Sequence, residues 1–343
     1  MFIVILAKDQ LFLSDNAIAY VAAIFAATNF LSSYYFGRAS DYYGRSIFLY
    51  IGLISCSLAF LLQIVIWDFW SYLVIRVLTG ICMGIFPAAL IAYVHESKRK
   101  LGAFSSFGAM GWFIGMIVSG IIAQYLFLRS VFIFSSLLFI IAFAISLRLP
   151  PIGHKAIKVP LFPKKIIKEN FAVYSSVLTR HSGAHMMWVF WPLYLQTLGA
   201  NLLWIGIIQA TNAITQVIVM FFILDRIESK KSIFFGLFLS GMTFLSFTLA
   251  QDYIQLLPSQ VFLGMSWSLM YVGAIKYINE RSEERGTATG ILTSIISISS
   301  LIGSMLAVLF IAIFGEYRWI ILCAAILAFV GFGLYTTLSK TKN

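Results

Sequence analysis

The sequence carries little charge for its length of 343 residues. Only 11% of the residues are Asp, Glu, Lys or Arg, against about 25% in soluble domains, and 61% are hydrophobic. This balance excludes an ordinary soluble domain and is typical of a helical protein that crosses a membrane many times. The apolar residues lie in long runs and do not alternate with polar ones, which excludes an outer-membrane barrel.

Cysteines and catalytic motifs are also scarce. Cys56, Cys82 and Cys323 fall in separate apolar runs without a C-x-x-C spacing, so they indicate neither a disulfide framework nor a metal site. No G-x-x-x-x-G-K-[ST] loop is present to bind ATP, and no nucleophile–base pairing suggests an enzyme. We therefore expect no enzymatic activity, no cofactor and no metal.

No acidic residue lies in the middle of an apolar run. All 13 Asp and Glu residues fall in loops or near the ends of spans. A proton-coupled carrier usually keeps an ionisable residue inside the membrane. Three alternatives remain open: His181 or His185 carries the proton, the carboxylate lies in a missing part of the first span, or the carrier is passive.

Positive charge is unevenly distributed along the chain. The net charge is +11, but the basic residues lie in short loops between apolar spans, so we expect no nucleic-acid partner. One set of alternate loops, with the central linker and the tail, holds 19 of the 24 Lys and Arg residues. The opposite side holds Lys8, Arg129 and Arg318. The positive-inside rule then predicts a multi-pass plasma-membrane protein whose linker and C-terminus are cytoplasmic.

The apolar runs have the length of membrane-spanning helices, about 20 residues each. A polar, proline-containing and lysine-rich stretch separates two groups of runs. We expect an N-terminal helical bundle at 1–148, a linker at 149–170 and a C-terminal bundle at 171–343. After a partial first span, the expected spans are 16–36, 47–66, 70–94, 102–123, 129–147, 171–195, 202–224, 232–250, 254–278, 287–314 and 318–338.

The short loop between the second and third spans reads GRASDYYGRS. Gly37 and Gly44 permit a tight turn, and Asp41 and Arg45 are four residues apart, close enough to pair or to cap a helix end. A loop this short connects two spans and is too small to be a domain.

These four residues resemble the G-x-x-x-D-x-x-G-[RK] signature of major facilitator superfamily transporters. Tyr42 and Ser46 differ from the pattern, since basic residues are usual there. The resemblance covers essentially the whole chain. It implies an all-α membrane fold of two six-helix bundles, with spans 1, 4, 7 and 10 along the transport path. It also implies that the loop controls the inward/outward equilibrium.

An internal repeat at an offset of 184 residues supports this architecture. Six spans separate the matched positions, so the two halves share one orientation, as in a transporter built from parallel repeats. The Asp225–Arg226 pair is then the second gating loop. The matched pairs are Asp41 with Asp225, Val77 with Val261, Gly80 with Gly264, Tyr93 with Tyr277, Glu96 with Glu280, and Gly102 with Gly286.

The same offset leaves the first span incomplete. Residues 1 to about 13 match only the second half of the span at 171–195. We hypothesise that the sequence begins in the middle of the first span, as a truncated or mis-started form of a twelve-span protein. The alternative is a protein with a short embedded first segment.

Two arginines lie inside spans, and a buried charge costs at least about 2.5–3.5 kcal/mol on insertion scales. Arg76 with Gly80 and Gly84 resembles the R-x-x-x-G-x-x-x-G pattern of superfamily exporters. Arg76 and Arg180 are interpreted as clamps for an anion or a carboxylate, which a guanidinium binds bidentately. The alternative for Arg76 is bonding to backbone carbonyls and bracing of helices.

Three further residues share the helix of Arg180. His181 and His185 are one turn apart and could relay protons. No carboxylate or cysteine accompanies them, so a metal is not expected. Trp188 lies on the face of Arg180 and would either stack on a substrate or pack at the interface.

Other polar and aromatic residues are predicted to line a central cavity, because polar side chains within spans either pair across helices or face a wet cavity. Gln209, Asn212 and Gln216 follow one stripe of a helix. The complete set adds Asn29 in span 2 and Gln260, Trp267 and Tyr271 in span 10.

Span 5 contains Gly111 and Gly115, four residues apart, a spacing that allows helices to approach closely. It weakly resembles the G-x-x-x-G-P-x-x-G-G motif of superfamily antiporters, but the proline is missing. We therefore interpret Gly111 and Gly115, with Gly80 and Gly84, as packing residues.

The combined interpretation is a monomeric secondary transporter of a small solute, working by alternating access, with protons or ions as candidate coupling partners. Two intramembrane arginines without a buried acid favour an anionic or carboxylated solute. One alternative is a drug, hydrophobic-compound or sugar efflux carrier of the same superfamily. Another, of a different class, is a non-transporting membrane sensor on the same scaffold.

Overall fold

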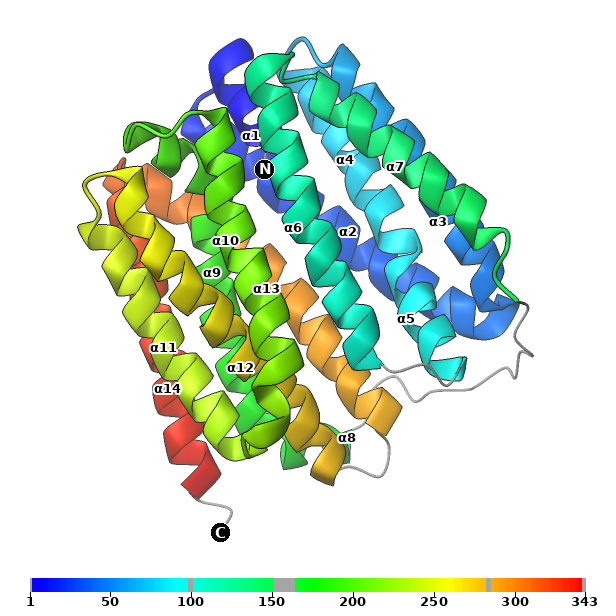
Figure 1. The fold of residues 1–343 in the computed structure, drawn as a ribbon, viewed down its shortest axis with the longest axis vertical. Helices are drawn as coiled ribbons and strands as arrows, with labels where there is room; N and C mark the ends of the chain where they lie inside the picture. Colours follow the sequence, from blue (N-terminus) through cyan, green and yellow to red (C-terminus); the bar gives the residue numbers. More distant parts are fainter. Residues whose placement is uncertain (1, 98–100, 151–163, 282–284, 341–343) are drawn as a thin grey trace. The chain divides into compact units, whose positions relative to one another are not determined.

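The structure is a computed structural model that describes residues 2–97, 101–150, 164–281 and 285–340 (Figure 1). The described residues form helices and no strands. The helices are α1 (Phe2–Ile5), α2 (Asp15–Tyr43), α3 (Arg45–Leu62), α4 (Phe69–Ile85), α5 (Pro87–Glu96), α6 (Leu101–Tyr125), α7 (Ser130–Ser146), α8 (Lys164–Glu169), α9 (Phe171–Thr197), α10 (Leu202–Phe222), α11 (Ser229–Leu249), α12 (Leu256–Arg281), α13 (Arg285–Phe314) and α14 (Tyr317–Lys340), with short turns at η1 (Leu6–Gln10), η2 (Gln63–Val65), η3 (Leu224–Arg226) and η4 (Tyr253–Gln255).

The all-α membrane fold predicted from the sequence is confirmed. Within the described ranges, nine helical segments are long and apolar enough to cross a membrane, and α7 is a shorter apolar helix. The 27-residue helix α9 has the length of a span but is not among the nine. Arg180, His181 and His185 interrupt the apolar sequence of α9. Polar residues within a membrane helix usually face the interior of the helix bundle.

The fourth expected span is present as one segment long and apolar enough to cross a membrane, Phe69–Ile91, but its helix is interrupted. It consists of α4 and α5, which are separated at Phe86. Pro87 has no N–H to donate and its ring clashes with the preceding turn, although Phe86 before it keeps helical dihedrals of φ −96° and ψ −26°. The break therefore falls directly before the proline, which occupies the first position of α5.

Two compact units divide the chain. Unit 1 comprises Met1–Ser105 and Ile121–Pro160, and unit 2 comprises Ser106–Gly120 and Leu161–Asn343. In unit 1, α2 packs on α4, and α3 packs on α4 and α7 (Figure 1). Phe48, Leu49, Ile85, Ala89 and Tyr93 form a buried cluster there.

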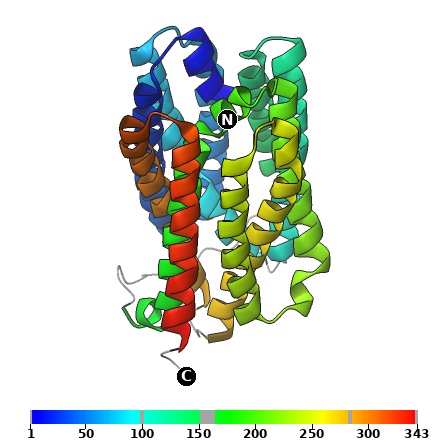
Figure 2. The same ribbon diagram turned by 90° about the vertical axis from the view of Figure 1, so that its left-hand side faces the viewer.

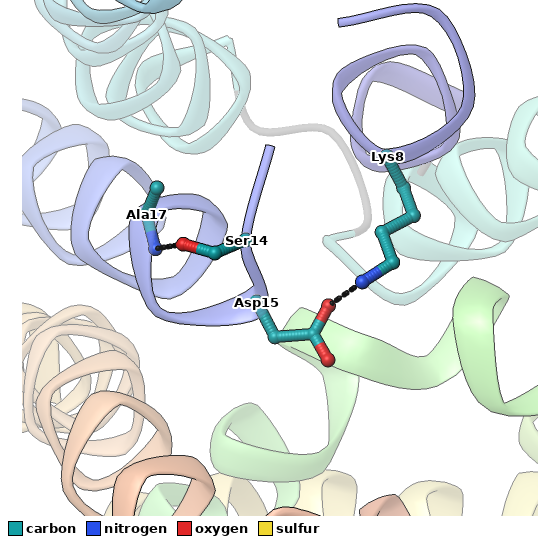
Figure 3. Close-up of polar contacts among 4 residues, drawn as sticks. All are labelled: Lys8, Ser14, Asp15 and Ala17. Carbon is teal, nitrogen blue, oxygen red and sulfur yellow. Dashed lines mark hydrogen bonds and ion pairs between the residues drawn. The ribbon is translucent and has the colours of Figure 1, made fainter. Parts of the chain in front are cut away.

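At one end of unit 1, polar contacts tie the η1 turn to the start of α2 (Figure 3). Lys8 Nζ lies 2.6 Å from Asp15 Oδ1. The Ser14 hydroxyl accepts a hydrogen bond of 3.3 Å from the Ala17 amide and so caps α2. These contacts fix the first segment against the helix that follows it.

In unit 2, α14 runs along α9 and α11, α9 also packs on α13, and α12 packs on α10 and α11 (Figure 2, with α14 in red). One buried cluster includes Tyr174 of α9, Leu237 of α11, Met270 of α12, Leu292 of α13 and Tyr335 of α14. Ile166 of α8 belongs to the same cluster, so six helices share this core.

Glycine contacts repeat between the units at the offset found in the sequence. A Cβ at Gly52 would meet Phe86, and a Cβ at Gly236 would meet Met270. Likewise Gly80 faces Thr28, and Gly264 faces Asn212. In every case the partner positions also differ by 184, so the sequence repeat is a repeat of helix-packing surfaces.

A second repeated feature is an arginine at the start of the last helix of each unit. The Arg129 guanidinium donates to the carbonyl of Ile64 after α3, and Arg318 donates to the carbonyl of Ala250 after α11, at 2.8 Å. A cation at a helix C-terminus satisfies carbonyls that have no partner within the helix. Two of the three basic residues on the predicted outer side, Arg129 and Arg318, therefore have structural contacts.

The predicted gating loop at 37–46 is mostly helical, contrary to the prediction, because α2 extends to Tyr43 and α3 begins at Arg45 with Gly44 as the turn between them. Gly44 has φ +98°, a conformation that favours glycine, and Arg45 donates to the Ser40 hydroxyl at 2.8 Å. The Asp41, Tyr42 and Asp225 side chains lie outside the described residues, so their predicted roles stay predictions. Gly37 approaches Ala88 of α5, and Arg226 ends the η3 turn.

The predicted close packing at Gly111 and Gly115 is not found. Among the described residues, no atom lies within 4 Å of a Cβ built at either position. Among the described glycines of α6, Gly120 packs closely, since it faces Gly206 of α10. A four-residue glycine spacing permits a close approach, but the neighbouring helix determines which glycines are used.

Candidate functional site

In unit 2, Arg180 is enclosed near the middle of α9. The residue is 2% exposed, and its Nε donates to the Ser240 hydroxyl of α11 at 2.9 Å. That hydroxyl lies 3.0 Å from the Ser266 hydroxyl of α12. A Cβ at Gly331 of α14 would meet the Arg180 backbone, so this glycine lets α14 approach the base of the arginine.

A chain of ring nitrogens extends from Arg180. One guanidinium nitrogen lies 3.3 Å from His181 Nδ1, and His181 Nε2 lies 3.2 Å from His185 Nε2. His185 Nε2 is also 2.8 Å from the Ser300 hydroxyl of α13. His181 is buried, whereas His185 is half-buried. The chain thus runs from an enclosed charge toward a more accessible imidazole.

Aromatic rings cover this polar chain on the α12 side. Trp267 stacks on His181 with ring centroids 4.8 Å apart, and Tyr271 stacks on Trp267 at 5.0 Å. The Arg180 guanidinium lies 5.1 Å from the Phe244 ring centroid and 5.5 Å from that of Trp267. Such contacts stabilise a cation where no anion is at hand.

Four amide side chains form a second polar group, on α10 and α12. Gln216 donates to the Asn212 side-chain oxygen at 2.5 Å. However, Gln209 Oε1, Asn212 Nδ2 and both amide atoms of Gln260 are buried without a hydrogen-bond partner. Buried amides are normally paired with protein or water, and these unpaired atoms lie on α10 and α12, two helices that pack on each other.

Unit 1 holds Arg76 on α4, with its guanidinium 3.8 Å from the ring centroid of Phe25 on α2. The residue is half-buried, and its Nε is buried without a hydrogen-bond partner. No acidic side chain of the described residues pairs with it. Nearby, Asn29 donates to the Gly80 carbonyl at 3.3 Å, which joins α2 to α4 rather than leaving the amide free.

The structure therefore brings together one part of the predicted cavity set within unit 2: Arg180, His181, His185, Trp267 and Tyr271. Trp188 is separate from this chain of contacts. It is half-buried and meets Trp191 edge to face, with centroids 5.4 Å apart.

Sequence reasoning missed the residues that complete the network. Ser240 anchors the arginine and Ser300 contacts His185, but a lone serine in an apolar span carries no distinguishing signal. Phe25 and Phe244 look like ordinary core residues, although each lies against a guanidinium.

Part of the chain resembles curated proteins in sequence. It is 30% identical over 122 residues to multidrug resistance protein MdtG of Enterobacter lignolyticus, a match that covers 34% of this chain and 29% of that protein. It is 34% identical over 116 residues to the protein of the same name from Salmonella paratyphi B, covering 32% and 29%. Each match spans less than a third of the relative's own length.

The fold has a solved counterpart. The crystal structure of a mutant of the nucleoside transporter NupG superposes with a TM-score of 0.78 over 98% of this chain and 94% of that one, at 12% identity. A sequence model described as Major Facilitator Superfamily matches residues 1–223 and 173–343, which together span the whole chain. The loop signature, the repeat, the fold and this match agree, and the chain belongs to the Major Facilitator Superfamily of membrane transporters.

Proposed function

We propose that the protein is a secondary transporter that carries a small anionic or carboxylated solute across the plasma membrane by alternating access. It acts as a monomer, with its central linker and C-terminus in the cytoplasm. The orientation rests on the concentration of Lys and Arg in one set of loops.

The observation that carries the solute class is the state of Arg76. Arg76 is half-buried within a membrane helix, its guanidinium has an aromatic ring on one side, and no described carboxylate neutralises it. A charge in this position is costly unless a partner arrives. A solute carboxylate supplies that partner and matches the planar donor geometry of a guanidinium.

Unit 2 contributes a second arginine within a membrane helix that has no described acidic partner. Arg180 is bonded to Ser240 and His181, and no described acidic residue pairs with it. Its enclosure behind Trp267 means that a solute reaches it only after that ring moves. Two uncompensated arginines repel a cationic solute and attract an anionic one.

A second candidate, export of hydrophobic compounds, is favoured by a different observation. Trp267 and Tyr271 stack nearly parallel, with an angle of 6° between their planes, and both are only partly buried. Such a surface binds flat apolar molecules. The two relatives described above are named multidrug resistance proteins, which agrees with this alternative.

Thermal unfolding with three ligands that share one ring separates the candidates. Benzoate, benzamide and benzamidine are anionic, neutral and cationic. We expect benzoate alone to raise the unfolding temperature of the detergent-purified protein, and Arg76→Gln to abolish that rise. The matched control is Arg148→Gln, because Arg148 is exposed.

Two results would favour the export alternative instead. One is stabilisation by benzamidine or benzamide as strong as that by benzoate. The other is a benzoate effect that survives Arg76→Gln. In either case the guanidinium would be a structural cation held by Phe25.

A further inference from the structure

We propose that His181 and His185 form a proton-binding site in which His185 Nε2 is the acceptor and Arg180 controls its occupancy. That this site couples protons to transport rests on the proposed function. The proton site itself rests only on the geometry of unit 2.

Arg180 fixes the direction of hydrogen bonding along the chain. A guanidinium can only donate, so His181 Nδ1, at 3.3 Å, accepts. The proton of neutral His181 is then on Nε2, and it points at His185 Nε2, 3.2 Å away. His185 Nε2 therefore carries the lone pair, and its own proton is on Nδ1.

Only one ring nitrogen in this network can take a further proton. At His181 Nδ1, an added proton would face the N–H of Arg180. At His185 Nε2, it can form a bond of 2.8 Å to the Ser300 hydroxyl oxygen, while the hydroxyl hydrogen turns to the Ile296 carbonyl at 3.2 Å. The proton comes from a hydronium ion, water leaves, and no covalent bond within the protein breaks.

Proton uptake changes the contacts between helices. Protonated His185 and neutral His181 present N–H groups to each other across 3.2 Å, so their contact is lost while the bond to Ser300 on α13 strengthens. A Cβ at Gly303 of α13 would meet His185 Cβ and the Ser182 carbonyl, so α13 and α9 are closely packed here. The proton thus moves His185 away from His181 and toward α13.

Among the described residues, Arg180 is the one charged group near the pair. α10 carries no charged residue, and the faces of α13 and α14 toward this part of α9 present Ser299, Ser300, Gly303, Ala324, Leu327 and Gly331. From α12 and α11 come Trp267 with Tyr271 behind it, Ser240 and Phe244. The lysines of α8 precede the first turn of α9.

A positive charge next to the pair opposes a second one. Binding of an anion at Arg180, or movement of the guanidinium away from His181, removes that opposition. Anion and proton then favour each other's binding, which is the linkage expected of uptake in the same direction. Of the two histidines, His185 is half-buried and His181 is buried, so a proton reaches the pair at His185.

The test is a pH titration of the full chain in detergent, followed by NMR of labelled histidines. The signal of His185 is the one lost in His185→Gln. We expect its midpoint to rise by about one pH unit or more in Arg180→Gln, since the opposing charge is gone. An unchanged midpoint, or no titration of His185 between about pH 4 and 9 in either protein, would overturn the proposal.

If Arg180→Gln does not fold, a second pair of variants tests whether His185 Nε2 binds the proton. Ser300→Ala removes the acceptor of protonated His185, so the midpoint should fall. Ser299→Ala is the matched control, because that hydroxyl donates to Leu178 and Ile295 and contacts no histidine. Equal midpoints in the two serine variants would contradict the proposal. These titrations need no solute, so their outcome is independent of whether transport is found.

Discussion

The fourth span of unit 1 and α12 of unit 2 occupy the same place in the repeat, yet they differ in two respects. Asp68 and Asp252, 184 residues apart, each accept a backbone N–H at the start of the segment. After the repeated glycine contacts along the chain, however, Pro87 interrupts the helix of the unit 1 span. The corresponding residue of unit 2, Tyr271, lies within the continuous helix α12.

The second difference lies in charge. Arg76 in unit 1 corresponds to Gln260 in unit 2, a fully buried amide without partners. The close contacts at Gly52 and Gly80 recur at Gly236 and Gly264, while the arginine of unit 1 has an amide as its counterpart. The internal repeat therefore preserves helix packing, whereas the polar residues within the spans are specific to each unit.

We expect the largest effect from a proline in α12 of unit 2 at the position that corresponds to Pro87 of unit 1. Tyr271→Pro removes one backbone N–H inside α12 and introduces a ring clash, which costs about 3 kcal/mol or more. Tyr271→Phe keeps the aromatic ring and should be nearly neutral by comparison. The thermal unfolding temperatures of the two variants measure the difference, and equal temperatures would show that α12 tolerates a break at this position.

The repeated glycine contacts should be the next most sensitive sites. Gly236→Ala and Gly52→Ala each place a methyl group against a neighbouring helix, at Met270 and at Phe86. Overpacking of this kind costs about 1–3 kcal/mol. Gly333→Ala is the matched control, since nothing lies within 4 Å of its Cβ position. If all three variants unfold at the same temperature, the packing repeat carries no stability.

Much of this arrangement is predictable from the sequence, for identifiable reasons. The spans follow from the length and hydropathy of the apolar runs. The offset of 184 residues pairs Gly80 with Gly264, and these two glycines make corresponding contacts. Prolines within membrane helices are often accommodated, so Pro87 alone did not predict a break.

The network around Arg180 was only partly predictable. Residues one turn apart on α9 could be placed on one face, because helical periodicity is local. Ser240 and Ser300 come from other helices, and their contacts depend on how α11 and α13 pack against α9. Spacing along the chain holds no information about that packing.

The gating loops provide a functional comparison between the halves. Asp41→Asn and Asp225→Asn remove one charge from corresponding loops. We expect each to slow transport by about fivefold or more, with little change in thermal stability, because a latch acts on the equilibrium between two folded states. Parallel losses of transport and stability would mean that the carboxylates are merely helix caps.

The smallest effect concerns the cap of α4. Hydrogen bonds from Ser71, first from its side chain and then from its backbone N–H, lower the pKa of Asp68. A lowered folded-state pKa stabilises the protein above the pKa of the unfolded chain, about 3.9, and this contribution is lost as the pH falls through the folded-state value. Wild type and Asp68→Asn should therefore differ slightly in unfolding temperature near neutral pH and converge in acid. A constant difference across the pH range would contradict this.

The central claim is that uncompensated arginines within the membrane helices select an anionic solute. The most direct test is counterflow in proteoliposomes with short carboxylates and their matched alcohols, gluconate against sorbitol being the leading pair. We predict exchange of carboxylates and not of the alcohols, with the exchange lost in Arg76→Gln and kept in Arg148→Gln. Equal exchange of acids and alcohols, or exchange of tetraphenylphosphonium that Arg76→Gln leaves unchanged, would contradict the claim.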